Sequence, residues 1–282
     1  ALERENLTVL TDTNVNKIIV NNGRATGVSC IGEDGNAFEV KASKEVLLSS
    51  GAFGSPQVLL RSGIGPEQEI TKHGIEHKVE LPGVGKNLQD HIDYLSVHKY
   101  KSLNLFGFSL GTIFFKYPLE LIKYILTKTG MFTSTVAEAG GFIRSRNDIT
   151  VPDIQLHFAP GMVVDHGRVN VWGTGLSCHT CLLRPKSRGE VTLQSADPSD
   201  DPKIDPKFLS HPDDMRDMVA GYKKMMKVMN KEPLSKNTSS HVQRPVDLDN
   251  DEDIEHYVSM LSNFDNPEVH ELLTKHFVEL RA

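Results

Sequence analysis

The segment best suited to chemistry is a corner of small residues between an apolar run and the start of a helix. Residues 45–65 read EVLLSSGAFGSPQVLLRSGIG, and residues 46–48 form a short apolar run typical of a buried strand. Ser55 and Pro56 favour a helix start, because serine caps the first turn and proline is tolerated there. Backbone N–H groups at such a corner can approach an anion such as a pyrophosphate. An ordinary tight strand–helix connection is the alternative.

A second group of reactive side chains is the CxxC pattern formed by Cys178 and Cys181, with His179 between them. The surrounding residues predict a strand, in which positions three apart point to opposite faces, so the two sulfurs would diverge. A zinc site would also need further ligands at suitable spacing. A metal or thiol protein centred on these cysteines is therefore the third of three interpretations.

Two segments resemble signature blocks of the glucose–methanol–choline (GMC) family of flavin oxidoreductases, which use FAD to oxidise alcohols. They are residues 45–65 and residues 81–91, which read LPGVGKNLQDH, in the order and at the spacing of the family. Residues 140–146 and 182–198 resemble blocks of the family's substrate domain. The resemblance covers about residues 7–229.

The resemblance implies where FAD would contact this chain. A backbone group of Val15 would lie on the adenine ring, and the corner at Gly51 and Ala52 would press its main chain against the cofactor. In the family, the segment that ends in Asp90 and His91 marks the crossing from the flavin domain to the substrate domain. His91 is therefore not expected to be a catalytic base, and we assign no catalytic residue.

Two motifs that such an enzyme needs are missing from the sequence. No GxGxxG fingerprint, the usual device for holding the ADP half of FAD, occurs in the chain. The family's late His-Pro-x-Gly-Thr block, which carries the catalytic histidine, cannot be aligned either, and three late histidines do not replace it: His256, His270 and His276. We therefore expect an internal fragment of a choline dehydrogenase-like or broader alcohol dehydrogenase, inactive by itself. FAD would belong to the full-length parent and be absent from this chain. A non-catalytic binding protein that has kept the substrate domain is the second interpretation.

Composition limits the partners. A chain of 282 residues with 38% hydrophobic and 24% charged residues suits a soluble globular protein. The net charge of −6 and the pI near 6.1 argue against a nucleic-acid partner. The family resemblance implies a small-molecule alcohol as the partner. Three cysteines make no disulfide framework, which makes a reducing compartment the default. The compartment (cytoplasmic or membrane-associated), the alcohol, the electron acceptor and the oligomeric state stay open.

The longest apolar stretch, residues 103–126, has the length of a membrane span but not its composition. Lys116, Glu120 and Lys123 interrupt it, and Pro118 lies in its middle. We interpret it as a helix packed on the protein, with contact to a membrane or a position over a pocket as alternatives.

The expected fold class is α+β: an antiparallel sheet backed by helices, together with part of an FAD-binding β-meander and βα unit. The meander comprises predicted strands at 6–11, 15–20, 24–31 and 37–40, with a hairpin turn at 33–36. The sheet comprises strands at 94–100, 139–144, 153–158, 176–183 and 190–194. Helices are expected at 213–229, where methionines form one apolar stripe, at 248–261, and from 266 onward. The predicted domains are 1–91 (partial FAD-binding), 92–245 (substrate-binding) and 246–282 (C-terminal helices).

Overall fold

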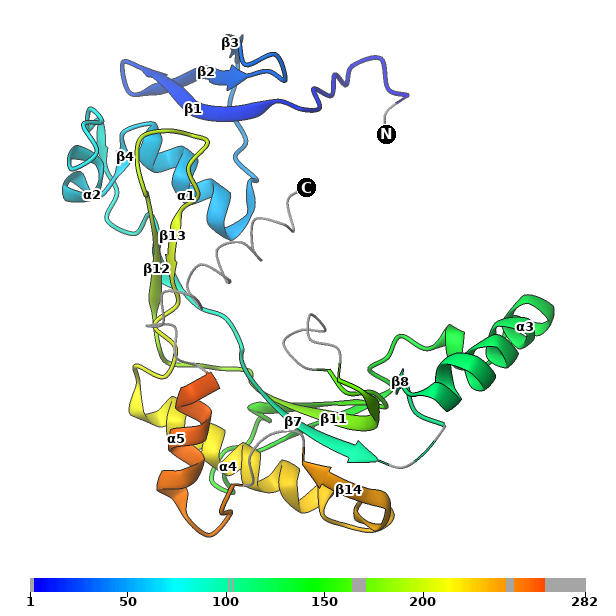
Figure 1. Cartoon of the computed structure of the whole chain (residues 1–282). Helices are drawn as coiled ribbons and strands as arrows, with labels where there is room; N and C mark the ends of the chain where they lie inside the picture. The colour runs from blue at the N-terminus through cyan, green and yellow to red at the C-terminus, as the bar shows by residue number, and fades with distance from the viewer. Residues whose placement is uncertain (1–2, 101, 103, 164–170, 242–245, 262–282) are drawn as a thin grey trace. The chain divides into compact units, whose positions relative to one another are not determined.

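The computed structural model describes residues 3–100, 102, 104–163, 171–241 and 246–261 (Figure 1). The described residues form two compact units. The first contains the described residues up to Gln89 together with Arg188–Lys207, and the second contains Asp90–Ser187 and the described residues from Phe208 onward. The domain boundaries predicted at residues 91 and 245 stay a prediction.

A three-stranded antiparallel meander opens the first unit. Its strands are β1 (Asn14–Asn21), β2 (Arg24–Ile31) and β3 (Ala37–Lys41), in the spatial order β1-β2-β3. Asn22 and Gly23 join β1 to β2 with φ angles of 50° and 74°, which a tight hairpin requires and which asparagine and glycine adopt most readily. The strands predicted at 15–20, 24–31 and 37–40 are confirmed.

Two other strands predicted in this region are not formed. Residues 6–11 and 46–48 are irregular, and Leu47 is 80% exposed rather than buried. A strand needs a neighbour to satisfy its backbone N–H and C=O groups, and neither segment pairs with any strand in the described part of the chain. An apolar run shows that a segment can form a buried strand, but it does not supply the partner strand.

Helix α1 (Gly51–Arg61) follows this segment and starts earlier than expected. Ser50, not Ser55, is the N-cap residue. The Ser55 hydroxyl accepts a hydrogen bond from the backbone N–H of Ser50 at 3.1 Å, so Ser55 supports the corner from inside the helix. Pro56 accordingly lies within α1.

The rest of the first unit packs around α1. A parallel pair, β4 (Ile64–Gly65) and β5 (Val79–Glu80), flanks the short helix α2 (Glu67–Thr71). A small antiparallel sheet has the order β13-β12-β6, formed by β6 (Lys86–Leu88), β12 (Gly189–Thr192) and β13 (Lys203–Asp205). The hydrophobic core of the first unit contains Leu60, Ile70, Val84 and Leu193. We predicted a strand at 190–194 in the larger sheet, and that placement is wrong, because β12 pairs with β6 and β13 instead.

An antiparallel sheet forms the centre of the second unit. Its order is β14-β7-β11-β10-β9, with β7 (Ile92–Tyr100), β9 (Ala139–Ile143), β10 (Ile154–Ala159), β11 (Gly173–Leu182) and β14 (Thr238–His241). The short strand β8 (Gly107–Phe108) pairs with the start of β11. The antiparallel arrangement predicted from strands without intervening helices is confirmed, as is the α+β class.

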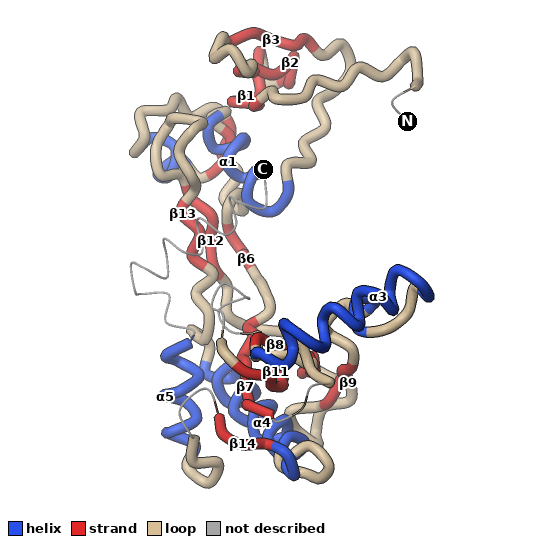
Figure 2. The backbone as a smooth tube through the Cα atoms, turned by 45° about the vertical axis from the view of Figure 1, so that its right-hand side comes forward, coloured by secondary structure: helices blue, strands red, loops and turns tan. Residues whose placement is uncertain are grey.

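Helix α4 (Pro212–Met229) packs on this sheet, and α5 (Asp251–Leu261) packs on α4 (Figures 1 and 2). The predicted methionine stripe is buried: Met218 and Met225 are 0% exposed and Met229 is 2% exposed. Gly221 allows close approach, since a Cβ there would lie 2.9 Å from the Cδ1 atom of Ile154 on β10. Tyr94 of β7 completes the interface with edge-to-face contacts to Tyr222 and Tyr257, among others.

The apolar stretch predicted as a packed helix forms a π-helical turn, η1 (Thr112–Lys116), that continues into α3 (Tyr117–Thr127). No residue of α3, all of them described, is buried, so the prediction of a packed helix is wrong. α3 packs against η1 and the short 3₁₀ helix η2 (Met131–Thr133) and extends away from the sheet of its unit (Figures 1 and 2). A further 3₁₀ turn, η4, spans Ser235–Asn237. The helix predicted from residue 266, with His270 and His276, lies outside the described residues.

Candidate functional site

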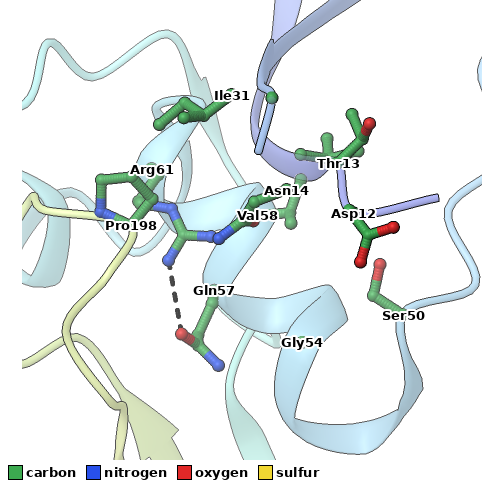
Figure 3. Close-up of a pocket in the computed structure, with 12 residues that line it drawn as sticks. Asp12, Thr13, Asn14, Ile31, Ser50, Gly54, Gln57, Val58, Arg61 and Pro198 are labelled. Carbon is green, nitrogen blue, oxygen red and sulfur yellow. Dashed lines mark hydrogen bonds between the residues drawn. The ribbon is translucent and has the colours of Figure 1, made fainter. Parts of the chain in front are cut away.

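A groove in the first unit runs between the start of β1, the end of β2 and one side of α1, from its N-cap Ser50 to its last residue Arg61 (Figure 3). Its volume is about 610 Å³. Residues 12–15 and 31–32 line one side, and Ser50 with several α1 residues lines the other. Pro198, from the loop after β12, completes the lining. The groove is therefore built by the meander and corner that the sequence analysis singled out.

Of the three predicted cofactor contacts, Val15 lines the groove directly. Gly51 and Ala52 are not among the lining residues, but they lie in the first turn of α1 between Ser50 and Gly54, both of which line it. Gly51 has a φ angle of +75°, and a Cβ atom there would meet nothing within 4 Å. The backbone at this corner is thus open on the side where a side chain would otherwise project.

The N-terminus of α1 carries no compensating negative charge of its own. Its first turn has no acidic residue, and the Ser50 side chain makes no capping hydrogen bond within the described structure. The N–H groups of a first turn lack partners inside the helix and carry partial positive charge, so they favour a polar or anionic ligand group. Asp12, in a left-handed conformation with φ +51°, points toward Ser50 across the mouth of the groove (Figure 3). The groove therefore offers N–H donors beside a carboxylate acceptor.

Arg61 fixes the wall of the groove, and the sequence analysis missed it. The side chain is only 8% exposed, and its Nε donates to the backbone oxygen of Asn16 at 3.0 Å. Its Nη1 donates to Oε1 of Gln57 at 3.3 Å (Figure 3). In turn, Nε2 of Gln57 donates to the backbone oxygen of Phe53 at 3.0 Å. The sequence held one sign of this role: Arg61 is a charged residue directly after the apolar residues 58–60 of a predicted helix.

Ser62 makes a second connection between α1 and β1. Its hydroxyl accepts from the N–H of Ile18 at 2.7 Å and donates to the backbone oxygen of Val58 at 2.5 Å. Both bonds are buried: the bond from Ile18 holds the end of α1 against the middle of β1, and the bond to Val58 fixes the Ser62 hydroxyl at the end of the helix. Together with Arg61, they make this wall of the groove a preorganised surface.

A smaller cavity of about 260 Å³ lies in the second unit, beside His157 on β10 and His179 on β11. The two histidines are directly paired across the strands, with ring centroids 6.4 Å apart at 90°. Oδ2 of Asp93 on β7 lies 2.6 Å from Nδ1 of His179, an arrangement that orients the imidazole ring. Val136, which also lines the cavity, has a φ of +73°, a conformation that β-branched residues rarely adopt. Sequence reasoning had not connected Asp93 with His179.

The two cysteines of the CxxC pattern are buried free thiols. Cys178 belongs to the core under α4, whereas the Sγ atom of Cys181 donates to Oδ1 of Asp93 at 3.2 Å. Burial, with a smaller contribution from Asp93, raises the pKa of Cys178 to about 12. Burial and, after it, Asp93 also raise the pKa of Cys181 well above the usual range of a thiol. Metal ligation needs thiolates, so these environments disfavour a zinc or redox site. Among the described residues, no group of three or more His, Cys, Asp or Glu side chains could hold a metal ion.

Two models of one family match this chain. Residues 1–93 match the N-terminal GMC oxidoreductase domain, and residues 185–268 match the C-terminal one. The chain belongs to the GMC oxidoreductase family. The groove lies within the residues of the first match, except for Pro198, which belongs to the second match.

Several named members of the family are similar over most of the chain. An alcohol dehydrogenase [acceptor] of Pseudomonas putida is 41% identical over 227 residues, which are 79% of this chain and 40% of that protein. The mitochondrial choline dehydrogenase of Homo sapiens is 35% identical over 263 residues, which are 92% of this chain and 43% of that protein. The chain thus spans less than half the length of these relatives.

Solved structures agree in fold. A crystal structure of formate oxidase superposes with a TM-score of 0.79 at 26% identity, covering 92% of this chain and 50% of that one. An Aspergillus oryzae formate oxidase variant, studied for its FAD modification, gives a TM-score of 0.75 at 26% identity, covering 87% and 48%. GMC oxidoreductases of this kind are FAD-dependent.

Proposed function

We propose that this chain supplies part of an FAD-dependent oxidoreductase that oxidises the CH–OH group of an alcohol. The observation that carries the proposal is the groove between β1 and the N-terminus of α1, which lies within the GMC N-terminal match. The names of the alcohol and choline dehydrogenase relatives support a small alcohol, choline-like or otherwise, as the substrate.

The residues of the groove fit one end of FAD. Val15 offers the edge of β1 for a backbone contact with a flat ring, and the carboxylate of Asp12 can accept hydrogen bonds from ligand hydroxyl groups. The first-turn N–H groups at Gly51 and Ala52 can donate to a phosphate. We therefore assign the adenosine side of FAD to this groove. When bound, the flavin would accept the hydride that leaves the carbinol carbon.

The alcohol end is assigned to the second unit. Its cavity presents the imidazoles of His157 and His179, and Asp93 fixes the orientation of His179. An imidazole held by a carboxylate can bind a hydroxyl group in a defined direction, which suits substrate positioning. We assign no proton-abstracting residue, because the sequence contains no counterpart of the family's late histidine block.

The chain by itself is expected to be inactive. It lacks the GxGxxG fingerprint that grips the ADP half of FAD, so we expect it to purify colourless and to oxidise no alcohol with an artificial electron acceptor. Visible absorbance and dye reduction check this expectation. A yellow preparation with stoichiometric flavin would overturn the inactivity, and with it our view that the main cofactor grip lies elsewhere.

A binding experiment tests the groove itself. Calorimetric titration with ADP should detect weak binding, because half of a nucleotide site keeps part of its contacts. Ser50→Phe should weaken ADP binding about tenfold by filling the groove, whereas Ser49→Phe, at an exposed neighbouring position outside the lining, should not. Equal effects of both variants, or no ADP binding, would contradict the assignment.

The alternative is a non-catalytic binding protein that has kept the substrate sheet. The reading frame of the gene discriminates the two: a dinucleotide fingerprint upstream and a His-Pro-x-Gly-Thr block downstream would establish the enzyme.

A further inference from the structure

The strongest exposed feature of the molecule is an apolar helical arm in the second unit, formed by η1, α3 and η2. Its apolar side chains are far more exposed than a packed helix allows: Phe114 is 66% exposed, Phe115 72%, Leu119 67%, Ile125 58% and Leu126 76%. None of the residues of α3 is buried, and its packing partners are its own neighbours η1 and η2. Large contiguous apolar surfaces of this kind mark interaction sites.

The apolar residues of the arm share one broad face. In α3, Pro118, Leu121 and Ile125 follow helical spacing, and Leu119, Ile122 and Leu126 follow the same spacing one position later. The arm is therefore amphipathic, although its apolar face has no core to cover. Phe108 (45% exposed) and Trp172 (60% exposed) extend this surface at the base of the arm, where the two residues form a bridge between their backbones.

The charges of the arm are of one predominant sign. Lys116, Lys123 and Lys128 lie between Gly107 and Thr133, where the sequence has one acidic residue, Glu120. The Oε2 atom of Glu120 accepts a hydrogen bond from the backbone N–H of Met131 at 2.8 Å, so this carboxylate joins α3 to η2 within the arm. The arm is thus basic in a chain whose net charge is −6.

These features distinguish between possible occupants. Lysine is depleted in the cores of protein–protein interfaces, whereas a helix with an apolar face, lysines beside it and aromatic residues at its base suits the surface of an anionic bilayer. Long lysine side chains can keep their charge at the headgroups while their stems cover apolar surface. The continuous helical stretch η1–α3 spans Thr112–Thr127, fewer residues than the roughly 20 that cross a bilayer, which suits a position in the interface. Among the described residues, none of the helices is a candidate membrane span.

We propose that the η1–α3–η2 arm docks this protein on the surface of an anionic phospholipid bilayer, with the Phe114, Leu121 and Ile125 side of the arm entering the acyl boundary. The lysines of the arm face the phosphate layer, and Trp172 lies near the boundary. This role is independent of the groove in the first unit and of the cavity in the substrate sheet.

The full chain can be tested directly, because Trp172 is its single tryptophan. Vesicles of phosphatidylcholine with about 30 mol% phosphatidylglycerol should sediment the chain and shift its tryptophan emission to shorter wavelength. Pure phosphatidylcholine vesicles should do so about tenfold less, and about 0.5 M salt should reduce the difference. These measurements need no variant. Failure to bind either vesicle would overturn the proposal.

Variants localise the contact. The double variant Ile125→Glu/Leu126→Glu should lower partitioning at least about tenfold, because both side chains would bring charge into the acyl boundary. Val228→Glu is the matched control, since Val228 is also on a helix and is 51% exposed but lies outside the arm. Lys123→Gln should weaken binding to anionic vesicles about fivefold and leave binding to phosphatidylcholine alone nearly unchanged.

Two outcomes would contradict the proposal by identifying another role. Undiminished vesicle binding by a correctly folded double variant, checked by circular dichroism, would place the lipid contact elsewhere. Analytical ultracentrifugation without lipid supplies the second outcome. A dimer that the double variant dissociates, combined with no vesicle binding by the unmodified chain, would show that a second copy covers the arm.

Discussion

Helices α4 and α3 belong to the same unit and both carry an apolar stripe, yet the structure uses them in opposite ways. Met218 and Met225 of α4 are fully buried on the sheet, whereas Ile125 and Leu126 of α3 are 58% and 76% exposed. Periodic apolar residues thus establish that a helix has a face to cover, but not what covers it. One face stabilises the fold, and the other is available for a partner.

The largest expected difference between the two helices is in folding stability. Met225→Ala should lower the free energy of unfolding by about 2–5 kcal/mol, because it leaves a cavity in a closed core. Leu126→Ala should change it by no more than about 0.5 kcal/mol, since the side chain is already in solvent. Urea unfolding monitored by circular dichroism measures both. Similar losses for the two variants would mean that α3 is packed in solution.

The N-terminal anchors of the two helices give a second, smaller contrast. Asp214 in α4 is 2% exposed and accepts hydrogen bonds from the N–H groups of Lys186 and Ser187 at 2.7 and 2.8 Å, and from the Ser187 hydroxyl. Asp214→Ala leaves buried donors unpaired and should cost about 3 kcal/mol. Glu120→Ala in α3 removes one partly exposed bond and should cost about 1 kcal/mol or less. Equal losses in the free energy of unfolding by urea for Asp214→Ala and Glu120→Ala would contradict this difference between the two helices.

Thiol reactivity reports on the surface under α4 without measuring global unfolding. Cys178 is buried in the core that α4 covers, and burial raises its pKa to about 12, so a thiol reagent near pH 8 should label it slowly. Met225→Ala should accelerate labelling several-fold by loosening this contact, whereas Leu126→Ala should not. Mass spectrometry of the labelled peptide assigns the site. Fast labelling of the unmodified chain would contradict the buried interface.

The smallest expected change in folding stability concerns a cluster of surface ion pairs outside both helices. It shows how little an exposed contact contributes in comparison with α4 and α3. Lys86 and Lys207 bond to Glu190, and the hydrogen bond from Lys86 is the main cause that holds the pKa of this carboxyl below its usual range. A lowered folded-state pKa contributes stability above the unfolded value of about 4.3, and this contribution is lost as the pH falls through the folded value. Glu190→Gln should therefore cost a few tenths of a kcal/mol at neutral pH, and this cost should shrink as the pH falls from about 4.3 through the folded value. A pH-independent cost would show that the loss is not electrostatic.

Residue periodicity and turn residues predicted two kinds of element correctly. These are strands that pair with a neighbour close in the sequence, and strands or helices with one buried face. Strands β1 to β3, strand β7 and helix α4 followed alternation or helical spacing closely. The corner at Gly51 was also predicted from its small residues, although α1 begins before Ser55. These features depend on neighbouring residues in the chain, which is why a single sequence carries them.

Long-range pairing could not be predicted in the same way. Asp93 and His179 lie 86 positions apart, and the antiparallel register of β7 and β11 brings them together. The assignment of β12 to the small sheet depends equally on distant strands. The exposure of Leu47 and of the apolar face of α3 depends on whether another part of the molecule packs against them. Periodicity within one segment does not encode such a contact.

The central claim is that the groove between β1 and α1 receives the adenosine side of FAD. The most direct measurement is the map of backbone amide chemical shifts in ¹⁵N-labelled chain on titration with ADP. The largest changes should fall on Asp12 to Val15 and on Ser50 to Gly54, with the amides of α4 unaffected. Shifts confined to the second unit, or none at saturating ADP, would contradict it.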